Sequence, residues 1–400
     1  MTVKRAYKYR FYPTDEQAHN LACTFGCVRF VYNYALHRRK RSYFDHGVKL
    51  STKDLSAAIT ALKKEEGAAW LKEVSSVPLQ QALRHLDTAY TNFFEGRADY
   101  PTFKKKHHAQ SATYTDNAFT LKNGKLTLAK QKEPLHIVWS RPLPEGAQPS
   151  SVTVSRDKSG RYFVSLLVEE GRGTLPLTSK AVSIDLGLKS FLITSDGETI
   201  PNPKYYARDE KKLAQAQRKH ARKKKGGKNR NKARKKVARL HARIADTRHD
   251  FQQKTSTKLI RENQVICLET LNVKGMLQNH KLAKAISDVG WGEFTRQLEY
   301  KAKWYGHTLV KIDRWYPSSK TCSDCGHVLD TLTLDVREWV CPCCGTWHDR
   351  DINAAQNILA AGLAASACGE RVRPVGSRGS QATLVETGNL TRESGNPLAF

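Results

Sequence analysis

Hydrophobic and polar residues alternate along residues 3–12 of this 400-residue chain. Tyr7, Tyr9 and Phe11 fall on one side of the alternation, and Lys8 and Arg10 fall on the other. Successive side chains of a strand point to opposite faces, so this pattern predicts a β-strand with one aromatic and one basic face. We expect the tyrosines to pack within a sheet.

The pattern changes to a helical period over residues 14–96. Thr14 and Gln17 have the spacing of a capping box, and apolar residues follow at intervals of three and four. A second helical stretch follows Ser51, and a third begins near Pro78. The sequence therefore predicts a helical region that directly follows the first strand.

Residues 114–170 return to a period of two. Asn123-Gly124 is typical of a type I′ hairpin turn, and a second turn is predicted around residues 156–160. We expect the first strand and these later strands to form one small barrel or sheet. The helices would then be an insertion between its strands.

A linker at residues 171–180 precedes a second half, which opens with a predicted hairpin at 181–197. Apolar residues occupy one face of its first strand, which places Asp185 on the other. Residues 264–271 form a short apolar run typical of a buried central strand, with Glu269 near its end. A helix around residue 298, a strand at 307–312 and a helix at 352–365 are predicted to follow.

Four cysteines form two CxxC pairs, Cys322/Cys325 and Cys341/Cys344, separated by 15 residues. This spacing predicts a zinc ribbon, in which four thiolates bind one structural Zn²⁺. Cys343 makes the last ligand ambiguous, although CxxC spacing favours Cys344. Cys23 and Cys27 lie four residues apart on a predicted helix without partner ligands, so we expect them to pack in a core.

The chain carries 67 Lys and Arg against 38 Asp and Glu, a net charge of +29. Residues 204–249 contain 19 of these cations and three acids, which is more than half of the surplus. Weak helical periodicity on both sides of Gly226-Gly227 predicts a basic helical hairpin. Such a charge favours a nucleic-acid partner, although a solvated charged face is the alternative.

Other compositional features narrow the class of protein. An apolar run of about 18 residues, as needed to span a membrane, does not occur. The first residues lack the apolar core of a signal peptide. Scattered cysteines fit a reducing compartment, so we expect a cytoplasmic protein without a membrane partner.

Three carboxylates stand out by their context: Asp185 in a hairpin, Glu269 at the end of a buried strand and Asp351 at the start of a helix. Two hard divalent cations held by such acids can stabilise the attacking and leaving oxygens of a phosphodiester. Taken singly, each acid has an ordinary explanation: a turn former, a strand-end charge and a helix N-cap.

Taken together, these motifs resemble the TnpB family of transposon-encoded proteins, which are related to type V CRISPR effectors. The resemblance lies in Asp185-Leu-Gly, Leu268-Glu269, the four-cysteine ribbon and Asp351-Ile-Asn-Ala-Ala-Gln-Asn357. It extends to shorter segments across the chain, listed here: Arg29–Asn33, Phe93-Phe, Pro203–Tyr206, Ser287–Trp291 and Tyr316–Ser319. The Asp-x-Asn-Ala pattern selects Asp351 over the nearby Asp349.

The resemblance implies an α/β multidomain fold with an RNase H-like (RuvC) nuclease domain. A β-barrel-like wedge domain with a helical insertion would precede it. The implied ranges are 1–13 and 97–175 for the wedge domain, 14–96 for the helical recognition domain, 176–315 and 346–368 for the nuclease domain, and 316–345 for the zinc-ribbon target-binding insert. Residues 369–400 are rich in Gly, Ser, Arg and Thr, and we expect a disordered tail.

The activity implied by the resemblance is RNA-guided DNA cleavage. Asp185, Glu269 and Asp351 would hold two Mg²⁺ ions, with Mn²⁺ as an alternative. The partners would be a noncoding guide RNA from the transposon end and double-stranded target DNA, and a monomer is favoured. Two other hypotheses are a guide-dependent DNA-binding repressor without cleavage and a DDE-type transposase. The three intact acids argue against the first, and the position of the ribbon between the second and third acids argues against the second.

Basic and amide side chains are candidates for contact with nucleic acid. They are Lys8, Arg10, Gln80, Lys104, Lys105, Lys106, Arg222, Lys223, Lys224, Lys225, Lys235 and Lys236. Lysine and arginine would contact phosphates, whereas Gln80 could reach a base edge.

Overall fold

The computed structural model describes residues 2–171, 175–333 and 335–367. These residues form two compact units, one made of Thr2–Gly171 and the other of the described residues from 175 onward. Each unit is described by itself below. The tail expected beyond residue 369 lies outside the described residues.

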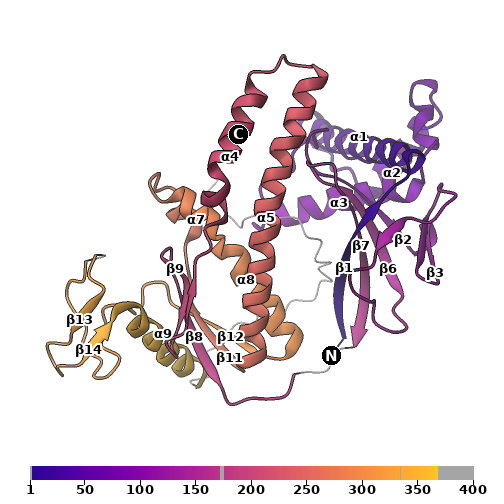
Figure 1. The fold of residues 1–400 in the computed structure, drawn as a ribbon. Coiled ribbons are helices and arrows are strands. Elements are labelled where there is room, and N and C mark those ends of the chain that lie inside the picture. The colour runs from indigo at the N-terminus through magenta and orange to yellow at the C-terminus, as the bar shows by residue number, and fades with distance from the viewer. Residues whose placement is uncertain (1, 172–174, 334, 368–400) are drawn as a thin grey trace. The chain divides into compact units, whose positions relative to one another are not determined.

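The first unit contains an antiparallel sheet with the strand order β2-β6-β7-β1-β5; β1, β2, β6 and β7 are labelled in Figure 1. Its strands are β1 (Thr2–Tyr12), β2 (Gln110–Thr115), β5 (His136–Val138), β6 (Pro149–Arg156) and β7 (Tyr162–Gly171). β1 pairs with β7 and β5, which follow it by more than a hundred residues. The predicted pairing of the first strand with the later group is therefore confirmed, as an open sheet with β2 and β5 at its edges.

Alternation along β1 has the predicted consequence. Tyr7, Tyr9 and Phe11 are buried in the core, whereas Lys8 is exposed on the opposite face.

A separate hairpin pairs β3 (Phe119–Lys122) with β4 (Lys125–Leu128). It turns at Asn123 and Gly124, whose φ angles of 50° and 72° are those of the predicted type I′ turn.

Helices occupy the chain between β1 and β2, as the sequence predicts. They are α1 (Asp15–His46), α2 (Thr52–Leu62), the 3-10 helix η1 (Glu66–Lys72) and α3 (Ser76–Phe94), and a short 3-10 turn, η2 (Asp116–Ala118), follows β2. The Thr14 side chain accepts a hydrogen bond from the Gln17 N–H, and the Gln17 side-chain oxygen accepts one from the Thr14 N–H. This capping box satisfies two backbone donors at the start of α1.

The second unit contains a mixed sheet with the order β10-β9-β8-β11-β12. Its strands are β8 (Ala181–Leu186), β9 (Ser190–Thr194), β10 (Thr199–Pro201), β11 (Val265–Glu269) and β12 (Thr308–Ile312). β8 is antiparallel to β9, which confirms the predicted hairpin, and β11 is parallel to both β8 and β12.

Helices cover both faces of this sheet (Figure 1). They are α4 (Tyr205–Ala221), α5 (Lys228–Glu262), α6 (Val273–Met276), α7 (Ala283–Val289), α8 (Trp291–Tyr305) and α9 (Arg350–Ala367). Leu268 packs with Leu259 of α5 and Phe294 of α8, whereas its neighbour Cys267 packs on the other face with Ile358 of α9. The apolar run of β11 is thus explained by burial on both sides.

The basic helical hairpin is formed by α4 and α5, which lie side by side. Arg230 closes its turn by donating to the carbonyls of His220 and Lys223. α5 continues beyond the predicted end near residue 249 because Leu259 and Ile260, in its last turns, are buried against the sheet. Over the described residues, every helix is too short or too polar to cross a membrane.

Candidate metal and carboxylate sites

Two of the three carboxylates lie on adjacent parallel strands. Ile184 of β8 is in register with Leu268 of β11. The next residues along the two strands are Asp185 and Glu269, so both acids reach the same edge of the sheet. This proximity follows from the parallel pairing, because neighbouring parallel strands end on one side.

The third carboxylate comes from α9, which packs against β8. The Ser183 hydroxyl donates to the Ala355 carbonyl, and this contact joins strand and helix. Asp351 lies one helical turn before Ala355, and Asp185 lies two residues after Ser183 on the same face of the strand. The third acid is therefore directed to the same edge as the first two.

The charges of Glu269 and Asp351 act on Asp185. Burial raises the pKa of Asp185 to about 7, and the charges of Glu269 and Asp351 add to this effect. The Arg350 guanidinium opposes the shift, and the Arg337 guanidinium lies 3.4 Å from the Asp351 carboxylate. A carboxyl group that is protonated near neutral pH beside two others is typical of a site where a cation belongs.

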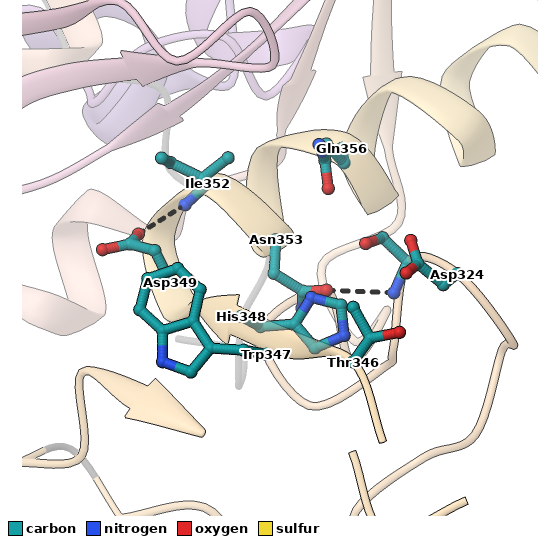
Figure 2. Close-up of a pocket in the computed structure, with 9 residues that line it drawn as sticks. Asp324, Thr346, Trp347, His348, Asp349, Ile352, Asn353 and Gln356 are labelled. Carbon is teal, nitrogen blue, oxygen red and sulfur yellow. Dashed lines mark hydrogen bonds between the residues drawn. The ribbon is translucent and has the colours of Figure 1, made fainter. Parts of the chain in front are cut away.

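Asp349 has a different role from Asp351. Its carboxylate accepts the backbone N–H groups of Asp351 at 3.0 Å and of Ile352 at 2.9 Å. These contacts make Asp349 the N-cap of α9, as the dashed line to Ile352 shows in Figure 2. The ordinary explanation of Asp351 as a helix cap is therefore wrong, and its carboxylate instead accepts from the Arg337 guanidinium at 3.4 Å.

Glu269 is held by a residue for which the sequence suggested no role. The Ser318 hydroxyl donates to Glu269 Oε1 at 2.5 Å. The Ser318 carbonyl accepts from the Asn357 amide at 2.8 Å, and Asn353 and Asn357 both donate to the Thr321 carbonyl. The only signal for this network is the occurrence of Ser318, Asn353 and Asn357 in the motifs that carry the family resemblance.

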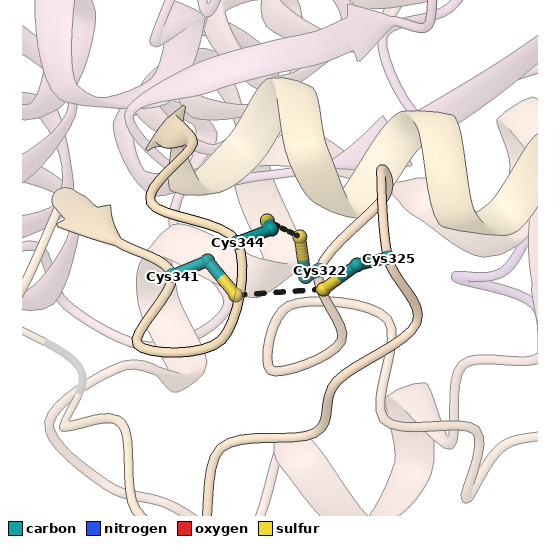
Figure 3. A group of neighbouring side chains, drawn as sticks. All are labelled: Cys322, Cys325, Cys341 and Cys344. Atoms are coloured by element: carbon teal, nitrogen blue, oxygen red, sulfur yellow. Dashed lines mark hydrogen bonds between the residues drawn. The ribbon is translucent and has the colours of Figure 1, made fainter.

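The four predicted cysteines form a compact cluster (Figure 3). The sulfurs of Cys322 and Cys344 lie 3.6 Å apart, as do those of Cys325 and Cys341. Zn–S bonds of about 2.3 Å in a tetrahedron place sulfurs about 3.8 Å apart, so the cluster fits one zinc ion. Cys343 is exposed and is not among the four clustered thiols.

The four thiols differ in their electrostatic surroundings. Hydrogen bonding with the side chain and backbone of Thr346 lowers the pKa of the Cys344 thiol to about 6. Burial raises the pKa of Cys322. At Cys325 a backbone hydrogen bond with His327 is outweighed by burial and the neighbouring thiols, which raise the pKa of that thiol. His348, buried against the Trp339 ring, places Nε2 3.1 Å from Cys322 Sγ. Two short strands, β13 (Glu338–Val340) and β14 (Trp347–Asp349), connect this cluster directly to the start of α9.

The described carboxylates are less tightly gathered than the cysteines. The cysteine ligand atoms all lie within 4.8 Å of one another, and no group of three acids in the described part of the chain is as close. A cavity of about 210 Å³ lies between the first CxxC turn, β14 and α9. Trp347 and Asp349 are among the residues that line it (Figure 2).

The candidates for nucleic-acid contact differ in their surroundings. Most are exposed side chains: Lys8, Gln80, Lys105, Lys106, Arg222, Lys223, Lys224, Lys225, Lys235 and Lys236. The Arg10 guanidinium is half-buried over the rings of Tyr12 and Phe163. Lys104 instead places its ammonium 4.2 Å from the centre of the Tyr32 ring, and desolvation lowers its pKa.

Cys27 is buried in the core of the first unit, as predicted for a packing residue, and burial raises its pKa to about 11.

Comparison with known proteins gives three family matches along the chain. A model described as "Probable transposase" matches residues 164–280, and one described as "Cas12f1-like, TNB domain" matches residues 291–358. A third, described as "Helix-turn-helix domain", matches residues 1–47. Within that last range the structure has one strand and one 32-residue helix, without a second helix across a turn.

Relatives match nearly the whole chain. A Streptomyces pristinaespiralis protein named "Putative RNA-guided DNA endonuclease" is 60% identical over 373 residues, covering 93% of this chain and 92% of that protein. The Escherichia coli (strain K12) protein "Putative RNA-guided DNA endonuclease InsQ" is 30% identical, covering 92% and 95%.

A solved structure shares the fold. The chain in the "Cryo-EM structure of the Cas12f1-sgRNA-target DNA complex" is 15% identical with a TM-score of 0.55, covering 89% of this chain and 98% of that chain. The sequence matches extend from the first sheet through the carboxylates to the cysteine cluster. On this evidence, the chain belongs to the TnpB family.

Proposed function

We propose that this protein is an RNA-guided DNA endonuclease with one RuvC-like, RNase H-like catalytic site. The main support is the convergence of Asp185, Glu269 and Asp351 at one edge of the mixed sheet, where burial and like charges raise the pKa of Asp185 to about 7. Such a site favours divalent cations, and the chain is 60% identical to a protein named as an RNA-guided endonuclease of DNA.

The three acids would hold Mg²⁺, or Mn²⁺ as an alternative. When bound, two such ions activate water and neutralise charge on the attacking and leaving oxygens of a phosphodiester. Asp185 would have to release its proton before it could act as a ligand near pH 7. Ser318 and Arg337 would hold the carboxylates of Glu269 and Asp351 in place, and the four cysteines would hold one structural Zn²⁺.

The domain plan of the family is proposed for this chain as well. The sheet of the first unit would form the wedge domain, and the helices inserted between β1 and β2 would form the recognition domain. The mixed sheet with α9 would form the RuvC-like domain, and residues 316–345 the target-binding insert. Sequence would be selected by pairing between the guide RNA and the target strand, while the protein holds the heteroduplex by its shape and backbone.

The α4–α5 hairpin is the best-supported phosphate surface. Arg222 and Lys223–Lys225 are exposed at its turn, and Lys235 and Lys236 are exposed along α5. Replacing Lys223, Lys224 and Lys225 by Ala should weaken nucleic-acid binding and lower the slope of log K against log salt, by roughly one for each lost phosphate contact. A matched control removes the same charge from the exposed Lys122, Lys125 and Lys132.

The direct test is programmed cleavage. The protein would be purified with its co-expressed flanking transcript and given a plasmid library with Mg²⁺. We expect guide-dependent cuts from the wild type and from Asp196→Ala, whose carboxylate is exposed at the β9–β10 turn. Asp185→Ala should bind the guide and lose cleavage. A wild type that cleaves no better than Asp185→Ala would refute the nuclease assignment.

The transposase hypothesis, which the description "Probable transposase" for residues 164–280 names but the endonuclease names of the relatives do not favour, can be tested in the same way. The same purified complex can be incubated with a labelled transposon end and a target plasmid. Joined products that require the three acids but no guide RNA would favour the transposase. Guide-dependent binding without any cut would favour the repressor.

A further inference from the structure

Ser318 links the carboxylate site to the cysteine cluster. It is 5% exposed and lies in the segment that connects β12 with the first CxxC turn. Its hydroxyl donates to Glu269 Oε1 at 2.5 Å, a hydrogen bond to a charged acceptor. Because the hydroxyl occupies one oxygen of Glu269, the carboxylate is held in one orientation while Oε2 stays available to a cation.

The backbone of Ser318 is itself fixed by α9. Asn357 donates to the Ser318 carbonyl at 2.8 Å, and both Asn353 and Asn357 reach the Thr321 carbonyl, at 2.7 and 2.6 Å. Asn353 also accepts the Ser323 N–H at 2.9 Å through its carbonyl oxygen. The two amides are 1% and 4% exposed, so they are shielded from competition with water.

These contacts join three parts of the second unit. α9 carries Asp351 two residues before Asn353, so the helix that supplies the third acid also holds the segment that orients the second. The same segment includes Cys322, a thiol of the cysteine cluster. The positions of Glu269, Asp351 and the first CxxC turn are thus set by one hydrogen-bonded network.

We propose that Ser318 is a positioning residue for Glu269, held by Asn353 and Asn357, and that it raises the affinity of the carboxylate site for its divalent cation. This inference rests on the proposed function, because it assigns the cation to that site. Groups that orient a ligating carboxylate typically contribute 10- to 100-fold to metal affinity.

The experiment measures Mn²⁺ binding to the guide-loaded, full-length protein by electron paramagnetic resonance. Ser318→Ala is compared with Ser319→Ala, since the Ser319 hydroxyl makes no hydrogen bond within the described ranges. Each substitution is made in the wild type and in Glu269→Gln. Zinc content is measured on every sample, so that a lost cysteine site is recognised.

We expect Ser318→Ala to weaken Mn²⁺ binding by at least about 10-fold in the wild type. In Glu269→Gln it should change binding by less than about twofold, because residues that act through one another are not additive. Ser319→Ala should leave binding and zinc content unchanged. The half-saturating Mg²⁺ concentration for cleavage should rise in parallel for Ser318→Ala.

Equal weakening of Mn²⁺ binding by Ser318→Ala in both backgrounds would show a general structural role and overturn the inference. Unchanged Mn²⁺ binding in both would overturn it as well. Loss of the proposed nuclease function gives a different result, because the wild type would then bind Mn²⁺ but not cleave guided targets. An Asn357→Ala variant, with the exposed Gln356→Ala as control, should weaken Mn²⁺ binding in the same direction as Ser318→Ala.

Discussion

Replacing Asp185 by Asn should make the metal-free protein more stable than the wild type, by an amount that grows as the pH rises. Burial, with the charges of Glu269 and Asp351, raises the pKa of Asp185 from 3.8 to about 7 in the folded state. Since the folded value lies above the unfolded one, this group's contribution to stability is complete below about pH 4. It is lost progressively as the pH rises through 7.

The size of the effect follows from the shift. One pKa unit corresponds to about 1.4 kcal/mol, so the full shift represents about 4 kcal/mol, of which about 3 kcal/mol falls between pH 5 and pH 8. The Asn variant lacks this ionisation. For a unit of roughly 200 residues, its Tm should therefore rise relative to the wild type by roughly 5 to 10 °C over that pH range.

The assay is thermal unfolding without Mg²⁺ and without chelator, so that bound zinc is retained. Asp196→Asn, which alters an exposed carboxylate of the same unit, serves as the control and should follow the wild type at every pH. Added Mg²⁺ should stabilise the wild type more than Asp185→Asn at pH 8. A Tm difference between Asp185→Asn and the wild type that stays constant from pH 5 to pH 8 would refute the reasoning.

Four further substitutions test other parts of the structure. Cys344→Ser should lose zinc, whereas Cys343→Ser should keep about one equivalent by elemental analysis; the reverse would make Cys343 the ligand. Gly362→Ala places a methyl group against Sγ and Cβ of Cys267. We therefore expect the free energy of unfolding, measured with denaturant, to fall by about 1 to 3 kcal/mol. An unchanged denaturant midpoint would contradict the close packing of α9. Asp288→Ala removes the acceptor of the Tyr206 N–H at the start of α4. The free energy of local opening there should fall by about 1 to 2 kcal/mol, which would be measured as faster amide hydrogen exchange.

Local features were predictable because they depend on neighbours in the chain. Alternation in β1, the capping box at Thr14 and the turn at Asn123-Gly124 each involve residues within a few positions of one another. The cysteine cluster was predictable for a related reason. Paired thiols at fixed spacing suit one tetrahedral ion, although the exclusion of Cys343 required the geometry.

Features that depend on distant residues required the tertiary structure. The basic pattern indicated an end to the hairpin near residue 249, whereas burial of the last turns of α5 against the sheet extends the helix to Glu262. Lys104 is one of a basic run in the sequence, yet its ammonium lies over the Tyr32 ring.

The sequence by itself determined most helices and strands, the two CxxC pairs that form the cysteine cluster, the family resemblance and the identity of the candidate acids. It left open whether Cys343 or Cys344 belongs to that cluster. Only the tertiary structure decided that Asp349 rather than Asp351 caps α9, that the charge of Asp351 acts on Asp185, and that Ser318 donates to Glu269. The physical reason is that these roles depend on hydrogen bonds and charges set by strand register and helix packing, and neither leaves a trace in local periodicity.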